Sequence, residues 1–163
     1  MEKNIFIKYQ ELDSFNLLSE LEIKIVKEAK LVANLAYAPY SNFHVGAALL
    51  LENNQIIKGN NQENTSFPCG ICAERVALFS AKSNFPDLLI KKIAITAKTN
   101  SFELNGPVGP CGLCRQVLLE YEEQQKHDIE VILFDTKKII KLARAKDLLP
   151  FYFQENKLKK NNL

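Results

Sequence analysis

Hydrophobic residues recur at steps of three and four between about residues 17 and 38, which is the period of an amphipathic helix. Pro39 ends this pattern, because proline cannot continue a helix. A nearly unbroken apolar run at 43–51 then predicts a strand that is buried on both faces. Turn-forming residues follow at 52–54, and the segment 55–61 is predicted to return as the second strand of a hairpin.

The rest of the chain alternates between short apolar runs and helical patterns. The apolar runs lie at 93–97, 131–134 and 139–142, and the helical patterns lie at 73–82 and 113–122. Such alternation is typical of helices packed around a mixed sheet, so we predict an α/β fold.

The chain has the size and composition of one compact domain, with 163 residues of which 47% are hydrophobic. No repeat or linker divides it, and we assign the domain to residues 17–154. Residues 1–16 form an N-terminal extension to which we assign no role. The polar, Asn-rich tail at 155–163 has little to bury and is expected to fray.

Charge and hydropathy limit the partners that we expect. The net charge of +2 is too small for a broad polyphosphate-binding surface, so nucleic acid is not expected as a partner. The first residues lack the apolar core of a signal peptide, and no segment approaches membrane-spanning length. We therefore expect a cytoplasmic protein without a membrane partner.

The four cysteines form two pairs, Cys69 with Cys72 and Cys111 with Cys114. In a reducing compartment such thiols are more often metal ligands than disulfides. The spacing alone is that of a closed structural zinc site with four sulfur ligands. Each pair also lies at the start of a predicted helix, whose N-terminus stabilises thiolates.

A carboxylate near the first pair indicates an open site instead. Glu74 follows Cys72 by two residues, which places it beside a bound metal, where a general acid and base would stand. Cys111 and Cys114 are three apart, so a first helical turn puts both sulfurs on one side, where they can share zinc with Cys72. Three sulfurs leave the fourth position to water, whose pKa zinc lowers. The helix dipole also favours an acid in a first turn, so this pattern alone leaves the role of Glu74 open.

Several ordered stretches resemble the cytidine deaminase family, in particular its small homotetrameric type. The matching stretches are AYAPYSNF at 36–43, VGAA at 45–48, NQEN at 61–64, CAER at 72–75, PCGLCRQ at 110–116 and LLP at 148–150. The resemblance implies a three-layer α/β/α fold around a mixed sheet of about five strands. It also implies hydrolysis of cytidine and deoxycytidine to uridine and deoxyuridine plus ammonia, in pyrimidine salvage.

The resemblance implies one zinc ion per subunit, held by Cys72, Cys111 and Cys114. Zinc-bound hydroxide would attack C4 of the cytosine ring while Glu74 shuttles the protons. Three thiolates make the zinc centre negative, and the resemblance implies that Arg75 donates a hydrogen bond to one of the sulfurs.

The resemblance also implies a set of substrate-binding residues. Asn61 and Glu63 hold the 3′-hydroxyl of the sugar, and as alternate residues of an extended segment they share one face. Phe43 packs against the base, and Ala73 belongs to the same set. Phe153 reaches the site of a neighbouring subunit, so a homotetramer with shared active sites is expected.

Some positions depart from the family pattern. Phe67 stands where many relatives have tyrosine, and Gly109 stands where serine commonly precedes Pro-Cys, so each lacks a hydroxyl group. Neither His44 nor His127 joins the zinc ligands by spacing. Three alternatives stay open: a deaminase of a cytosine-bearing nucleoside antibiotic, a polynucleotide cytosine deaminase, and a noncatalytic binding module with a four-cysteine zinc site.

Overall fold

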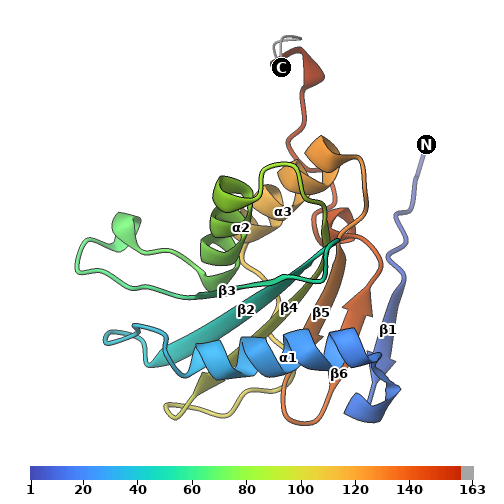
Figure 1. Cartoon of the computed structure of the whole chain (residues 1–163). Coiled ribbons are helices and arrows are strands. Elements are labelled where there is room, and N and C mark those ends of the chain that lie inside the picture. Colours follow the sequence, from blue (N-terminus) through green and yellow to red (C-terminus); the bar gives the residue numbers. More distant parts are fainter. Residues whose placement is uncertain (159–163) are drawn as a thin grey trace.

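The computed structural model describes residues 1–158, which form a six-stranded mixed sheet between two layers of helices (Figure 1). The strands are β1 (Tyr9–Leu12), β2 (Phe43–Leu51), β3 (Ile56–Asn60), β4 (Ile90–Thr99), β5 (Glu130–Phe134) and β6 (Ile139–Leu142). The α-helices are α1 (Glu20–Ala33), α2 (Ala73–Asn84) and α3 (Gly112–Gln125). Short 3-10 helices lie at Phe15–Leu17, Phe67–Cys69, Ala145–Leu148 and Asn156–Leu158.

The strands follow the order β1-β6-β5-β4-β2-β3 across the sheet. The β4 and β5 strands are parallel, and every other neighbouring pair is antiparallel. The connection between β4 and β5 passes through α3, as a parallel pair requires. This arrangement confirms the predicted α/β fold, with one strand more than the five expected.

The additional strand, β1, lies inside the predicted N-terminal extension. Tyr9–Leu12 pairs with β6 in antiparallel register from Tyr9 opposite Leu142 to Leu12 opposite Ile139. Three of the four β1 residues are exposed, so hydrophobic periodicity does not reveal the strand. Of the predicted tail, Asn156–Leu158 forms a 3-10 turn and residues 159–163 lie outside the described chain.

Helix α1 is shorter at both ends than the predicted segment 17–38. Ser19 caps its N-terminus, because the Ser19 side chain accepts from the backbone of Glu22 and the Glu22 carboxylate accepts from the backbone of Ser19. At the other end the chain leaves the helix after Ala33, before Pro39. The backbone of Tyr37 bonds to Asn61 and Glu63, which draws the segment away from the helix axis toward the site.

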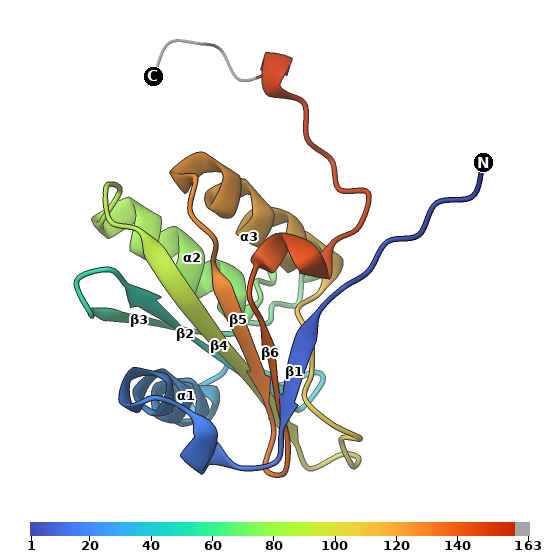
Figure 2. The ribbon, with the colours of Figure 1, turned by 90° about the vertical axis from the view of Figure 1, so that its right-hand side faces the viewer.

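Two apolar clusters hold the three layers together, one on each face of the sheet. Figure 2 shows α1 on one face and α2 with α3 on the other. Ile25 and Ala29 of α1 pack against Ala48 and Ile132, whereas Leu78 of α2 belongs to the opposite cluster. Because β2 runs between the layers, its residues from Gly46 to Leu51 are buried on both faces, as the sequence predicts, whereas the first three residues of the strand are only half-buried.

Within residues 1–158, no helix is long and apolar enough to cross a lipid bilayer.

Candidate active site

The N-termini of α2 and α3 lie on the same face of the sheet and carry the cysteines of the site (Figures 1 and 2). Cys72 is the N-cap of α2, Cys111 is the N-cap of α3, and Cys114 lies in the first turn of α3. Neither N-cap side chain bonds to its own helix backbone, so both sulfurs remain available to a metal. The positive ends of both helices favour thiolates at these positions.

The three sulfurs have the spacing that zinc requires. The Sγ atoms of Cys72 and Cys111 lie 3.8 Å apart, and those of Cys111 and Cys114 lie 3.5 Å apart. All three lie within 4.8 Å of one another. Sulfurs placed about 2.3 Å from a tetrahedral zinc ion are about 3.8 Å apart, so the cluster fits zinc with one position left over. Cys69 is exposed at the end of its 3-10 helix and is not part of this cluster.

The surroundings of the cluster favour a thiolate at Cys72. A hydrogen bond from Cys114 lowers the pKa of Cys72 to about 5, against the opposing effect of burial. Arg75 adds to this effect. The same contact with Cys72, together with burial, raises the pKa of Cys114. The lowered pKa of Cys72 favours its thiolate form, which is the form that binds a metal ion.

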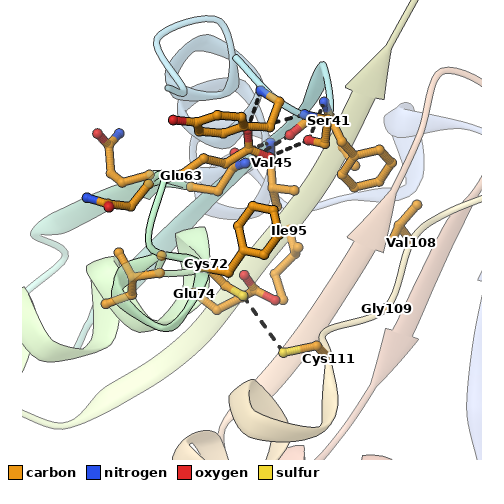
Figure 3. A pocket seen from close by; sticks show the side chains of 18 residues that line it. Ser41, Val45, Glu63, Cys72, Glu74, Ile95, Val108, Gly109 and Cys111 are labelled. Atoms are coloured by element: carbon orange, nitrogen blue, oxygen red, sulfur yellow. Dashed lines mark hydrogen bonds between the residues drawn. The ribbon is translucent and has the colours of Figure 1, made fainter. Parts of the chain in front are cut away.

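Glu74 lies in the first turn of α2, next to the cluster (Figure 3). Its side chain lines the cavity although the residue is only 3% exposed. Burial raises the pKa of Glu74, and the charge of Cys72 raises it further. Among residues 1–158, the buried Oε2 atom has no hydrogen-bond partner. A buried carboxyl with a raised pKa and a free oxygen is suited to accept and return a proton.

The two arginines that follow the ligands in sequence have different contacts. Burial lowers the pKa of Arg75, but hydrogen bonding to the Cys72 sulfur and its charge outweigh burial and raise this pKa. Arg115 points away from the cluster: its guanidinium donates to the carbonyl oxygens of Pro110 at 2.7 Å and Leu148 at 2.8 Å. Arg115 thus ties the loop before α3 to the C-terminal segment.

A cavity of about 720 Å³ opens over the sulfurs and is lined mainly by apolar side chains. Cys72, Cys111 and Glu74 lie at one end of it, and Ser41 with Glu63 lies at the other (Figure 3). This separation suits an elongated ligand with a reacting ring at the metal end and hydroxyl groups at the far end.

The predicted sugar-binding pair is held rigidly. The amide of Asn61 bridges two backbone groups of β2, accepting from Val45 N at 2.7 Å and donating to Phe43 O at 2.8 Å. Glu63 accepts from the backbone of Tyr40 at 2.9 Å and from the backbone and hydroxyl of Ser41. The Ser41 hydrogen bond is the main reason that the pKa of Glu63 lies below its ordinary value.

The other predicted substrate-binding residues occupy different places. Phe43 lines the cavity and stacks on Phe102 with a centroid separation of 6.1 Å. Ala73 is fully buried and is not part of the described cavity lining. Phe153 is 72% exposed and also lies outside the lining, while its carbonyl accepts from Gln116 at 3.0 Å.

The two residues that depart from the family pattern, Phe67 and Gly109, both line the cavity. Phe67 packs edge to face against Tyr40, at a centroid separation of 6.2 Å. Sequence reasoning assigned no role to Tyr40 or Ser41, which also line the cavity. The sequence feature that could have indicated these two residues is the polar turn that directly precedes the buried strand at Phe43.

Comparison with known proteins agrees with this geometry. The family model described as "Cytidine and deoxycytidylate deaminase zinc-binding region" matches residues 19–126. A cytidine deaminase of Sporosarcina psychrophila is 39% identical over 135 residues, which cover 83% of this chain and 93% of that protein.

Solved structures and a more distant relative extend the comparison. The crystal structure of a cytidine deaminase from Burkholderia pseudomallei superposes with a TM-score of 0.67 at 38% identity, covering 80% of this chain and 97% of that one. A blasticidin-S deaminase of Bacillus cereus is 26% identical over 148 residues, which cover 89% of this chain and 100% of that protein.

Proposed function

The chain belongs to the cytidine and deoxycytidylate deaminase family, and from this premise we propose that it hydrolyses both cytidine and deoxycytidine, with Glu74 moving the protons. The observation that carries the proposal is the position of Glu74. Its unpaired, buried carboxylate oxygen lies in the cavity beside three sulfurs that fit zinc. A purely structural zinc site has no use for a buried carboxyl at this position.

Zinc, held by Cys72, Cys111 and Cys114, would lower the pKa of a water molecule and supply the nucleophile. Glu74 takes a proton from the attacking water and delivers it to N3 of the cytosine ring. It then takes the remaining proton from the hydroxyl group that has bonded to C4 and carries it to the amino group, so that the C4–N bond breaks, ammonia leaves and the C4 carbonyl of the uracil ring forms. Burial supports these steps, because it raises the pKa of Glu74 and so favours, more than water does, the protonated form that donates to the substrate.

We assign the base to the metal end of the cavity and the sugar to the Glu63 end. Phe43 provides an aromatic face for the base, and Ala73 could contribute only through its backbone because its side chain is buried in the core. Glu63 and Asn61 are assigned to the 3′-hydroxyl. No residue is assigned to the 2′ position, and for this reason both ribose and deoxyribose substrates are expected.

Arg75 is proposed to partner the sulfur of Cys72. Its positive charge offsets part of the negative charge of three thiolates, and so keeps zinc acidic enough to activate water. Arg75 thus acts through the metal ligand and does not touch substrate.

A homotetramer with shared sites is proposed from the family resemblance. The exposed ring of Phe153 supports it, because this side chain does not line the cavity of its own chain and is free to enter that of a neighbour. Pyrimidine salvage and a cytoplasmic location also stay predictions.

The sequence leaves three alternative functions open, and one observation helps to judge each of them. The exposed position of Cys69, away from the sulfur cluster, argues against the four-cysteine binding module. The antibiotic deaminase is the second candidate, since the B. cereus protein matches most of this chain, although at lower identity than the cytidine deaminases. The near balance of 21 basic and 19 acidic side chains argues against a polynucleotide substrate.

The decisive experiment measures release of uridine and ammonia from cytidine by the purified protein, with Glu74→Ala assayed at matched zinc content. We expect wild-type turnover and a loss of about a thousandfold or more in the variant. A zinc-loaded, folded wild type that leaves cytidine unchanged but deaminates blasticidin S would favour the antibiotic deaminase. Absence of both activities would favour a binding module.

A further inference from the structure

The hydroxyl group of Ser41 connects the start of β2 with Glu63, which follows β3. Ser41 Oγ accepts a hydrogen bond from the backbone N–H of Phe43 at 3.0 Å and donates one to Oε1 of Glu63. Because the N–H of Phe43 can only donate, the hydroxyl proton of Ser41 must point to Glu63. One hydroxyl thus joins the residue assigned to the base with the residue assigned to the sugar.

The hydrogen bonds of Glu63 leave little freedom at its carboxylate. Oε2 accepts from two backbone groups, Tyr40 N at 2.9 Å and Ser41 N at 3.3 Å, whereas Oε1 accepts from the Ser41 hydroxyl. A carboxylate offers about four acceptor positions. Three are occupied, so Glu63 can accept from one further donor, and that position lies on Oε1.

The loop that carries Ser41 is anchored independently of the Ser41 side chain. Asn42 adopts a left-handed conformation (φ 52°), and its amide donates to Ser101 at 3.1 Å. The hydroxyl of Tyr40 bonds to Thr65 at 2.5 Å. Removal of the Ser41 hydroxyl therefore leaves these anchors of the loop in place, and it removes the hydrogen bond to Oε1 of Glu63 together with the one from the backbone N–H of Phe43.

We propose that Ser41 is a positioning residue, which orients Glu63 toward a single sugar hydroxyl and so sets the preference for nucleosides that carry this hydroxyl. The inference rests on the proposed cytidine deaminase function and on the assignment of Glu63 to the 3′-hydroxyl. Without the Ser41 hydroxyl, Oε1 is free to turn and to bind water, and the hydrogen bond to the sugar loses its preorganisation.

The test compares kcat/KM for cytidine and for 3′-deoxycytidine in wild type, Ser41→Ala and Ser41→Thr. Wild type is expected to prefer cytidine strongly, and Ser41→Ala is expected to reduce this preference about tenfold, with the loss confined to cytidine. Ser41→Thr keeps the hydroxyl group and should restore the preference. Unfolding temperatures of the three proteins are measured in parallel.

A second set of variants shows whether Ser41 acts through Glu63. In a Glu63→Ala background, Ser41→Ala should leave the preference unchanged, because there is no carboxylate to orient. A further loss in that background would mean that Ser41 binds substrate directly, which overturns the proposal. An equal fall for both nucleosides in Ser41→Ala alone, or an unchanged preference, would overturn it as well. Wild-type protein that turns over neither nucleoside would instead overturn the proposed function.

Discussion

Gly59 on β3 and Ala73 at the start of α2 lie in such close contact that no larger residue fits at position 59. A Cβ atom at Gly59 would lie 2.3 Å from the carbonyl oxygen of Ala73 and 2.5 Å from the backbone nitrogen of Ala77. Both contacts are backbone atoms and cannot rotate away. Because Gly59 has no side chain, the start of α2, with Cys72 and Glu74, can pack this closely on β3.

Gly59→Ala should displace this turn and destabilise the protein by about 2 kcal/mol or more, since overpacking of this kind cannot be relieved by side-chain rotation. Zinc content and turnover should fall together. Gly112→Ala is the matched control: it also lies next to a metal ligand, but a Cβ there meets nothing within 4 Å. Urea unfolding and zinc analysis of both variants would check this, and equal behaviour of the two would contradict it.

The cysteines should divide into three that hold zinc and one that does not. Serine at Cys72, Cys111 or Cys114 should remove most of the zinc, because each sulfur is one of three within 4.8 Å of one another. Cys69→Ser should keep full zinc content and activity, because Cys69 is exposed outside that cluster. Metal analysis of the purified variants decides the point, and loss of zinc in Cys69→Ser would restore the four-sulfur site.

The two arginines near the ligands should respond differently to substitution by glutamine. Arg75→Gln removes the partner of the Cys72 sulfur and should lower kcat about tenfold with little change in zinc content. Arg115→Gln removes two hydrogen bonds to backbone carbonyls and should mainly lower the unfolding temperature. Kinetics, zinc analysis and thermal unfolding together separate these outcomes. Unchanged kinetics in Arg75→Gln would remove it from the set of residues that support the metal.

The ion pairs of the buried Glu22 with Lys92 and Lys141 should make the free energy of unfolding depend on pH. Burial raises the pKa of Glu22, but hydrogen bonds from Lys141 and Lys92 outweigh it and hold the pKa far below the ordinary value of 4.5. The unfolded chain therefore takes up a proton at a higher pH than the folded one. The stabilisation is complete above about pH 4.5 and is lost as the pH falls further.

Glu22→Gln should reduce the free energy of unfolding by about 3 kcal/mol at neutral pH. The free energy of unfolding of this variant should also change less with pH than that of the wild type. Glu11→Gln is the control, because its pair with Lys138 is exposed to solvent and should contribute little to stability. Urea unfolding between pH 3 and 7 measures both variants. A wild-type acid dependence that persists in Glu22→Gln would show that other carboxylates cause it.

Much of the fold could be predicted from local patterns. The apolar run at Phe43–Leu51 and the segment Ile139–Leu142 match the observed strands residue for residue, and α2 begins at the predicted position. These elements bury a continuous face, so their pattern is strong. Strand β1 and the early end of α1 could not be predicted, because hydrogen bonds to β6 and to Asn61 determine them.

The sequence by itself determined the chemical groups of this protein: the cysteines, the carboxylate two residues after Cys72, and the polar pair Asn61 and Glu63. The family resemblance predicts that Cys72, Cys111 and Cys114 are the ligands, whereas the spacing of the cysteines alone also admits Cys69. The tertiary structure brings the three sulfurs together at two helix N-termini and leaves Cys69 outside the cluster. It also decided that Glu74 is buried and that Ser41 reaches Glu63 across 22 positions of the chain. Burial and long-range hydrogen bonds depend on how distant segments pack, and no local pattern records that.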